Sequence, residues 1–361
     1  MPTNVTPEYK RAKAAFQNAR DAVEKLSCLK EMLRTVPKHK GTEHLQAEIK
    51  TKIKELTDEL AGPRKGGART GQVQVVRPEG AAQVALVGPP NSGKSSLHAR
   101  LTGSRAEVGP YPHTTRAPQP GMLPFEDVHF QLVDLPPMSA SFVEPWMPNA
   151  LQLARAALLV VDPTATGCVE NVIAIRAQLE EKRVSLVDDW SGRLARGYLE
   201  SDPGPVPAGE PARREERTTI EADEADLLFR VRLRTLLVAN KHDLGFDADE
   251  IEVLEELVGA RFPAVAVSAV TGEGLGRIGT LLFHGLGIIR VYTKIPGHPP
   301  DKNRPYTLFA GGTVYEVARL VHRELADSLR FARVWGSGKF DGQQVGRDHV
   351  LRDRDVVELH V

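Results

Sequence analysis

Apolar side chains recur along this 361-residue chain with several different spacings, and each spacing predicts a different kind of structure. In residues 7 to about 35 and in 42–61 they return every three or four positions, as on one face of an α-helix. Residues 37–41, PKHKG, are a turn signal between the two segments. We therefore predict a helical hairpin, which together with the basic, glycine-rich linker after it accounts for residues 1–71.

From residue 80 to 288 short apolar runs alternate with helical segments. The predicted strands are 83–87, 128–133, 156–161, 235–239 and 263–267. Nearly continuous apolar strands are typical of a parallel sheet with helices on both faces. A stretch rich in proline, glycine and charge interrupts this pattern, and it predicts a flexible insertion near 184–228.

The pattern changes again in the last part of the chain, residues 289–361. Apolar runs at 289–293, 306–309, 331–335 and 356–361 predict strands, and a helix is expected from Thr313 to about 326. Strands with a single helix among them are typical of a small α+β domain.

The charge balance and the cysteines narrow the class of protein. Lys and Arg total 47, as do Asp and Glu, so the net charge gives no argument for a nucleic-acid or membrane partner. Two cysteines without metal-site spacing suit a reducing compartment. No apolar run approaches the roughly 20 residues of a membrane helix, and the N-terminus lacks the apolar core of a signal peptide. We expect a cytoplasmic protein with no membrane partner; these patterns do not define its oligomeric state.

The segment GPPNSGKSS, residues 88–96, carries the clearest chemistry. A glycine-rich turn between a strand and a helix presents backbone N–H groups to phosphate. Lys94 would place a charge near the outer phosphates, and Ser95 would offer a hydroxyl to Mg²⁺. The candidate phosphate-binding residues are Gly88, Asn91, Ser92, Gly93, Lys94, Ser95 and Ser96.

A second loop points to the base. Asn240, Lys241 and Asp243 follow a predicted core strand. An aspartate accepts hydrogen bonds from guanine N1–H and the 2-amino group, which adenine lacks, so adenine would leave this carboxylate unpaired. The Lys241 stem would cover the base, and Asn240 would tie the two loops together. The backbone at Ser268 and Ala269 would meet guanine O6. We therefore predict binding of GTP and GDP.

Two further segments suggest a Mg²⁺ site. Asp134 ends the strand 128–133 and could hold the metal through water. Thr114 and Thr115 lie between the phosphate loop and Asp134, and we favour Thr115 as a ligand to Mg²⁺ and a contact to the γ-phosphate.

The segments GPPNSGKS, YPHTT, DLPP, NKHD and SAVTGEG occur in the order of GTPase motifs, and the set resembles the Obg-type GTPases, especially the developmentally regulated (DRG) branch. The C-terminal segment is similar to the TGS domain, a ubiquitin-like β-grasp module. The resemblance implies an α/β P-loop G domain between a helical hairpin and a β-grasp domain, with Mg²⁺-dependent GTP hydrolysis and action on ribosomes or structured RNA. It assigns Lys94 and Thr115 the catalytic roles. Related GTPases use an asparagine at the position of Asn91 to hold K⁺; the alternative is that Asn91 is a favourable loop residue.

The third motif departs from the family pattern. Pro137 stands where the family has a glycine whose N–H meets the γ-phosphate, and proline has no N–H. Met138 follows where many other GTPases carry a water-orienting glutamine, and Obg-type enzymes also have an apolar residue there. We predict a slow GTPase; the alternative is a nucleotide-binding module without useful turnover, acting as an RNA or ribosome adaptor. An RNA-ligase-type enzyme is disfavoured because no second catalytic domain is visible.

Overall fold

The computed structural model describes residues 7–19, 22–36, 43–60, 76–104, 117–139, 143–190, 230–259, 262–338 and 340–361. Its first helices are α1 (Pro7–Asn18), α2 (Ala22–Thr35) and α3 (Glu43–Leu60). The sequence predicted one helix over 7–35, but two helices form and pack against each other. Tyr9 and Ala12 of α1 are thereby buried with Leu29 and Met32 of α2. A straight helix would have left this apolar surface in water.

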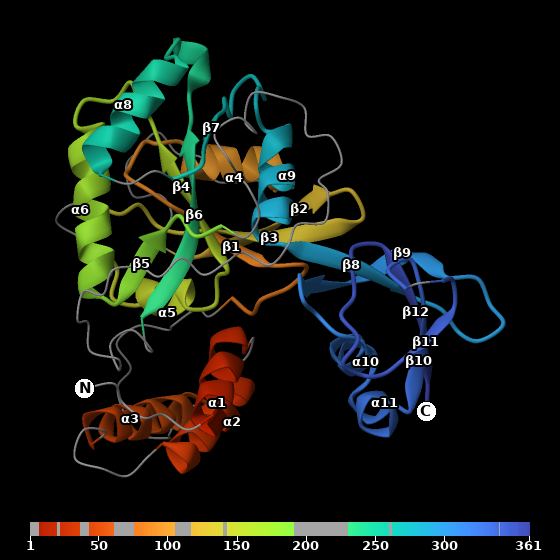
Figure 1. Cartoon of the computed structure of the whole chain (residues 1–361). Coiled ribbons are helices and arrows are strands. Elements are labelled where there is room, and N and C mark those ends of the chain that lie inside the picture. Colours follow the sequence, from red (N-terminus) through yellow and green to blue (C-terminus); the bar gives the residue numbers. More distant parts are fainter. Residues whose placement is uncertain are drawn as a thin grey trace.

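A seven-stranded sheet forms the central part of the chain (Figure 1). Its main path has the order β2-β3-β1-β4-β6-β5, and β7 pairs with the end of β6. All pairs are parallel except β2 with β3. The strands are β1 (Gln83–Val87), β2 (Gln119–Phe125), β3 (Val128–Asp134), β4 (Ala156–Val161), β5 (Val184–Val187), β6 (Val231–Ala239) and β7 (Ala264–Ala266).

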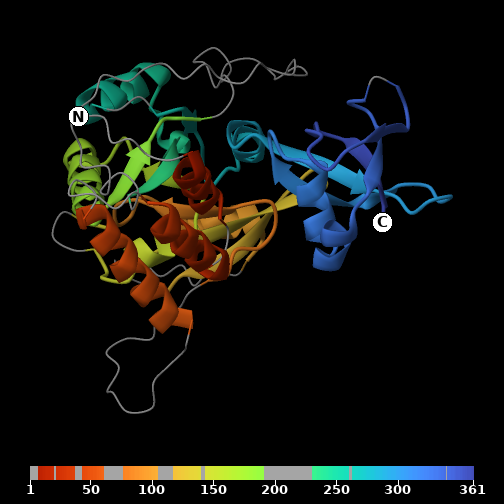
Figure 2. The ribbon, with the colours of Figure 1, turned by 60° about the horizontal axis from the view of Figure 1, so that its bottom comes forward.

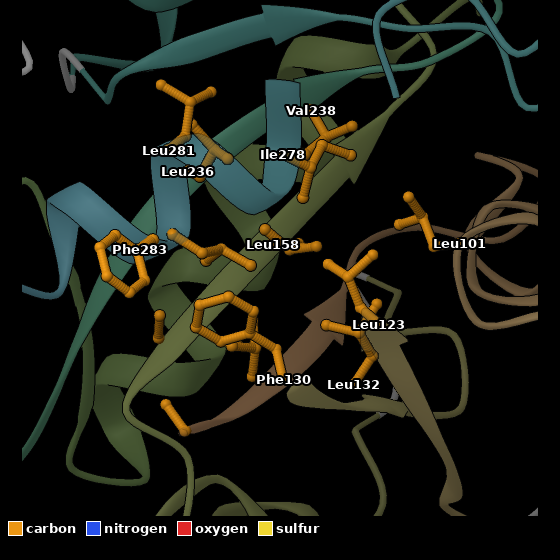
Figure 3. Close-up of a cluster of buried hydrophobic side chains, with 14 of the residues drawn as sticks. Leu101, Leu123, Phe130, Leu132, Leu158, Leu236, Val238, Ile278, Leu281 and Phe283 are labelled. Carbon is orange, nitrogen blue, oxygen red and sulfur yellow. The ribbon is translucent and has the colours of Figure 1, made fainter. Parts of the chain in front are cut away.

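Helices cover both faces of this sheet, as the continuous apolar strands predict. α4 (Lys94–Thr102) and α9 (Gly276–Gly285) bury Leu97 and Leu282 on one face, in the core shown in Figure 3. α5 (Met147–Leu151), α6 (Cys168–Glu181) and α8 (Ala248–Val258) cover the other face with residues such as Ile175 and Leu254. The predicted α/β class is confirmed.

Two strands were missed by the sequence analysis. β2 contains Pro120, Gly121 and Pro124, which argue against a strand; prolines are tolerated there because β2 is at the edge of the sheet. β5 occupies the start of the segment predicted as an insertion, since four apolar-patterned residues pair with β6. Residues 188–190 follow this strand, and the remaining residues of that segment, 191–228, lie outside the described residues.

The C-terminal part is a five-stranded sheet with the order β11-β10-β12-β8-β9, in which the central β12 runs parallel to β8. Figure 2 shows its two helices close to this sheet. The helix predicted over 313–326 is divided at His322. The elements are β8 (Ile288–Thr293), β9 (Asp301–Phe309), α10 (Val314–Val321), α11 (Arg323–Ser328), β10 (Phe331–Trp335), β11 (Gln343–Val345) and β12 (Asp355–His360). None of the helices in the described ranges is long and apolar enough to cross a membrane.

A buried arginine joins the two sheets. Arg290 of β8 binds Asp353 through Nη2 at 2.7 Å, binds Asp127 through Nη1 at 3.0 Å, and also contacts Glu126. The last two acids form the β2–β3 turn, whereas Asp353 precedes β12. Burial opposes ionisation of Asp127, but hydrogen bonds from Tyr292 and Arg290 outweigh it and hold the pKa of that carboxyl below its usual value. This junction fixes the C-terminal domain to the edge of the central sheet.

Arg290→Met should destabilise the protein by about 3 kcal/mol, because it leaves three carboxylates without their shared cation. The midpoint of urea unfolding measures the loss. Arg354→Met is a matched control, since Arg354 reaches the same Glu126 at 3.5 Å but its side chain is 66% exposed. The control should cost less than about 1 kcal/mol. Equal losses in the two variants would contradict a structural role for the buried junction.

Candidate functional site

The predicted phosphate loop connects β1 to α4, and the structure explains why two of its positions are glycine. Gly88 has φ 149, and a Cβ there would lie 2.2 Å from the Val160 carbonyl oxygen. Gly93 has φ 86, and its Cβ would lie 2.2 Å from Asn240 Nδ2. Both positions therefore exclude larger residues. Asn91 also has a positive φ, 59, a conformation that asparagine tolerates better than most residues.

Lys94 begins α4 and is almost fully buried. Its Nζ donates to the Pro89 carbonyl oxygen at 2.9 Å, and Ser92 Oγ donates to the same oxygen at 3.0 Å. Burial lowers the pKa of Lys94 to about 8, and the charge of Asp134 only partly opposes this shift. The ammonium thus lacks a close anionic partner among the described residues, and its charged form would be stabilised by a bound anion such as phosphate.

Ser95 and Asp134 meet at the start of α4. Ser95 Oγ donates to Asp134 Oδ2 at 2.6 Å, while Asp134 Oδ1 is buried and has no hydrogen-bond partner among the described residues. Burial raises the pKa of Asp134, against the opposing effects of Ser95, Lys94 and His98. A hydroxyl and a carboxylate with an unused oxygen fit a hard cation such as Mg²⁺. No group of three or more acidic, His or Cys side chains surrounds them in the described part of the chain, so phosphate and water would complete the shell.

Asn240 connects the phosphate loop to the predicted base loops. Its Nδ2 donates to the Ser92 carbonyl oxygen at 2.9 Å, and its Oδ1 accepts from the Ala269 N–H at 3.1 Å. Asn240 as a whole is 1% exposed. One buried amide therefore ties together segments that lie 148 and 29 residues away in sequence.

The other residues of the base loop are held in place from both sides. Ser268 Oγ donates to Asp243 Oδ1 at 2.5 Å, and Asp243 as a whole is exposed. Lys241 Nζ binds Asp162 Oδ2 at 2.7 Å. The sequence analysis did not select Asp162, although its position after the core strand 156–161, at the carboxyl edge of a parallel sheet, was an available signal.

The third motif offers no backbone donor in this conformation. Pro136 and Pro137 lack an N–H, and the Met138 N–H donates to the Gly88 carbonyl oxygen at 3.1 Å. Met138 itself is fully buried. The one backbone N–H of residues 136–138 is therefore already bonded to the phosphate loop.

The structure thus brings together the predicted residues from the phosphate loop, Asp134, the 240–243 loop and the 268–269 loop at one edge of the sheet. Ser96 lies in the first turn of α4, next to this edge. Thr114 and Thr115 lie outside the described residues.

Known proteins support the same interpretation. Residues 83–188 match the family described as 50S ribosome-binding GTPases, and residues 289–361 match the TGS domain. The chain is 30% identical to a GTP-binding protein of Halobacterium salinarum, over 93% of this chain and 98% of that protein. It is 28% identical to developmentally-regulated G-protein 2 of Arabidopsis thaliana, over 91% and 88% of the two chains. The solved YchF GTPase of Schizosaccharomyces pombe has a TM-score of 0.51 at 13% identity, covering 80% of this chain and all of that one, which is a likeness of fold.

Fold, site and matched domains therefore define a P-loop GTP-binding protein with a C-terminal TGS domain. The similarity to the archaeal and plant proteins extends over nearly the whole of each chain. This chain belongs to the Obg-type GTPase family, in the DRG branch, as its motifs indicated.

Guanine-nucleotide affinity should depend on pH through Lys94. Phosphate favours the charged ammonium, so the pKa of Lys94 in the complex lies above the value of about 8 in the free protein. Well below about pH 8 both forms are protonated and Kd is constant; as the pH rises through about 8, binding takes up a proton and Kd rises, about fourfold from about pH 7 to about pH 8.5. Calorimetric titration with GDP in buffers of different ionisation enthalpy measures this uptake. No proton uptake at about pH 8.5 would contradict the assignment of Lys94 as a phosphate contact.

Proposed function

We propose that the protein binds GTP and GDP and hydrolyses GTP slowly with Mg²⁺, in the cytoplasm, as a factor associated with the ribosome or with structured RNA. The observation that carries the nucleotide part is the Asn240 amide, which joins the phosphate loop to the two base loops in one site. Asp243 would accept from guanine N1–H and the 2-amino group, and the Ala269 N–H would be shared between Asn240 and guanine O6.

The phosphate end of the site supplies the catalytic groups. Lys94 would leave the Pro89 carbonyl oxygen and neutralise charge that develops between the β- and γ-phosphates. Ser95 and Thr115 would be ligands to Mg²⁺, with Asp134 behind a water molecule; bound Mg²⁺ supplies charge stabilisation at the phosphates. Among the described residues no side chain at this edge is placed as a general base. Catalysis would therefore rest on positioning and electrostatics.

Slow turnover and weak discrimination between GTP and GDP follow from the third motif. A switch must contact the γ-phosphate in one state only. Residues 136–138 have no available N–H for it, and a hydrogen bond to a charged group is worth about 1.5–3 kcal/mol. Lys94 and Thr115 would remain as γ-phosphate contacts.

Pro137→Gly should restore a donor at this position. We expect it to raise the preference for a non-hydrolysable GTP analogue over GDP by about tenfold or more and to speed hydrolysis. Paired titrations of both nucleotides on the two proteins measure the preference. A strong preference for the analogue in the wild-type protein would contradict the proposal, since another group would then replace the missing N–H.

The alternative function is a nucleotide-binding module without useful turnover, and the two consecutive prolines are the observation that favours it. Single-turnover hydrolysis of radiolabelled GTP separates the two. Release of phosphate that depends on Mg²⁺ and is lost in Lys94→Ala supports the enzyme. Bound GTP that stays intact over hours supports the module.

Asn91 leaves two interpretations of the monovalent ion. Its left-handed backbone explains asparagine as a loop residue, whereas a K⁺ site would use the side-chain oxygen as a ligand. The K⁺ site predicts hydrolysis about tenfold or more faster in K⁺ than in Na⁺, because a cation would stabilise charge in the transition state. Asn91→Ser should abolish the difference. Equal rates of the wild-type protein in both salts would leave only the loop role.

The proposed RNA contact rests on local positive charge in the N-terminal part and on the TGS domain. Lys50 and Lys54 are exposed on α3 at a spacing of four residues, where two like charges destabilise a helix. Glu48 lies nearby and pairs with Arg183 at 3.6 Å. Lys52 of the same helix also belongs to this proposal, and the other basic residues, in the turn 37–41 and the linker 62–71, lie outside the described residues.

Ribosome binding should therefore weaken steeply with salt, by about 10³-fold between about 50 and 200 mM if about six phosphates are contacted. Replacing Lys50 and Lys54 by Gln should reduce this dependence, and deleting residues 1–70 should reduce it further. Co-sedimentation with ribosomes over a salt series is the measurement. Unchanged co-sedimentation of the deletion variant would exclude the N-terminal contribution.

A further inference from the structure

Asp162 is a nearly buried acid with no role in the proposed chemistry, yet it directly contacts the base loop. It follows β4, and its Oδ2 lies 2.7 Å from Lys241 Nζ. The Lys241 side chain remains 33% exposed, whereas that of Asp162 is 9% exposed. The pair therefore joins a nearly buried carboxylate to a side chain that is partly exposed to solvent.

The carboxylate of Asp162 is itself held rigidly. Its other oxygen, Oδ1, accepts from the Thr164 backbone N–H at 3.1 Å and from Thr164 Oγ at 2.6 Å. Burial opposes ionisation, but the donors from Lys241 and Thr164 outweigh it and keep the pKa of Asp162 below its usual value. At neutral pH the group is an anion with one oxygen committed to its own loop and the other to Lys241.

The position of Lys241 is fixed at its backbone as well. Lys241 has φ 68, a left-handed conformation that is costly for a residue with a side chain. The preceding Asn240 N–H donates to the Val161 carbonyl oxygen at 2.8 Å, which holds the ends of β4 and β6 together. With both its ends fixed, the four-carbon stem of Lys241 must run from the end of β6 to the end of β4. The Lys241 side chain is held there in contact with Asp162 while 33% of it remains exposed.

We propose that Asp162 is a positioning residue for guanine binding, which holds Lys241 where its stem covers the base. The inference rests on the proposed function and adds a residue to its base site. Because the pair acts at the base and not at the phosphates, GDP and GTP depend on it equally. Guanine selectivity comes from Asp243, so the loss of Asp162 weakens binding without changing which base is preferred.

Asp162→Asn tests this role, because asparagine keeps an acceptor for Thr164 and removes the charge that holds Lys241. We expect fluorescent GDP and a fluorescent non-hydrolysable GTP analogue to dissociate about tenfold faster, with little change in association rate. The matched control is Asp189→Asn, which breaks an exposed pair with Arg232 toward the other end of β6 (3.0 Å) and should leave both rates unchanged.

A double-mutant cycle separates positioning from a general structural effect. Lys241→Met keeps a long apolar stem but loses the ammonium, and it should release nucleotide faster by a similar factor. In that background Asp162→Asn should add nothing. A full additional loss in the double variant would overturn the proposal, as would an Asp162→Asn protein with wild-type dissociation rates, or one that weakens GTP alone.

A further variant, measured in the same way, distinguishes failure of this inference from failure of the proposed function. Asp243→Asn should shift preference from guanosine to xanthosine nucleotides, whose 2-oxo group needs a donor. If that shift occurs and Asp162→Asn has no effect, only the role of Asp162 is wrong. If Asp243→Asn keeps its guanosine preference, the base site itself is wrong.

Discussion

The buried amide of Asn240 is the interaction on which the site depends. Its nitrogen donates a hydrogen bond to the phosphate loop, and its oxygen accepts one from the loop at Ala269. Both hydrogen-bond partners of this planar group are therefore backbone atoms. The group is buried, and removing either partner would leave an unsatisfied polar atom at a cost of about 1–3 kcal/mol. This contact also explains Gly93, since a Cβ at that position would meet the amide nitrogen. Three loops that are distant in sequence thus form one rigid edge of the sheet.

Around this fixed frame, the charged groups at the phosphate end are incompletely paired. Lys94 is buried and, among the described residues, donates only to a carbonyl oxygen. Asp134 has a buried oxygen without a hydrogen-bond partner in the described part of the chain. A bound metal–phosphate complex would stabilise the charged form of each group. Incomplete pairing of buried charges is typical of a binding site rather than of a structural core. The strand β3 carries Asp134 at one end and adjoins the Arg290 junction at the other. The TGS domain is therefore anchored to the strand that ends at the proposed metal site.

The alternation of apolar strands and helices predicted the central fold because each strand of a parallel sheet is buried on both faces. The positions of the candidate site residues could be inferred as well, since these residues follow those strands at the same edge. Strand β2 could not be predicted, because prolines are tolerated in a strand only at the edge of a sheet, and edge position is a property of the tertiary structure. The break between α1 and α2 was missed because both halves have helical spacing, and only the burial of Tyr9 against α2 separates them. Asp162 and Arg290 were missed for a related reason: a single charged residue shows its partner only when the chain is folded.

Competition between nucleotides tests the central claim most directly. Fluorescent GDP is bound to the purified full-length protein and displaced by unlabelled GTP or ATP. A site that hydrogen-bonds the guanine edge through Asp243 should reject adenine by a factor of about 10⁴, because bound adenine would cover the carboxylate without offering it a donor. GTP should therefore displace the label at concentrations far below those of ATP. Displacement by ATP and GTP at similar concentrations would show that the loop 240–243 does not read the base, and the account of the site would be wrong.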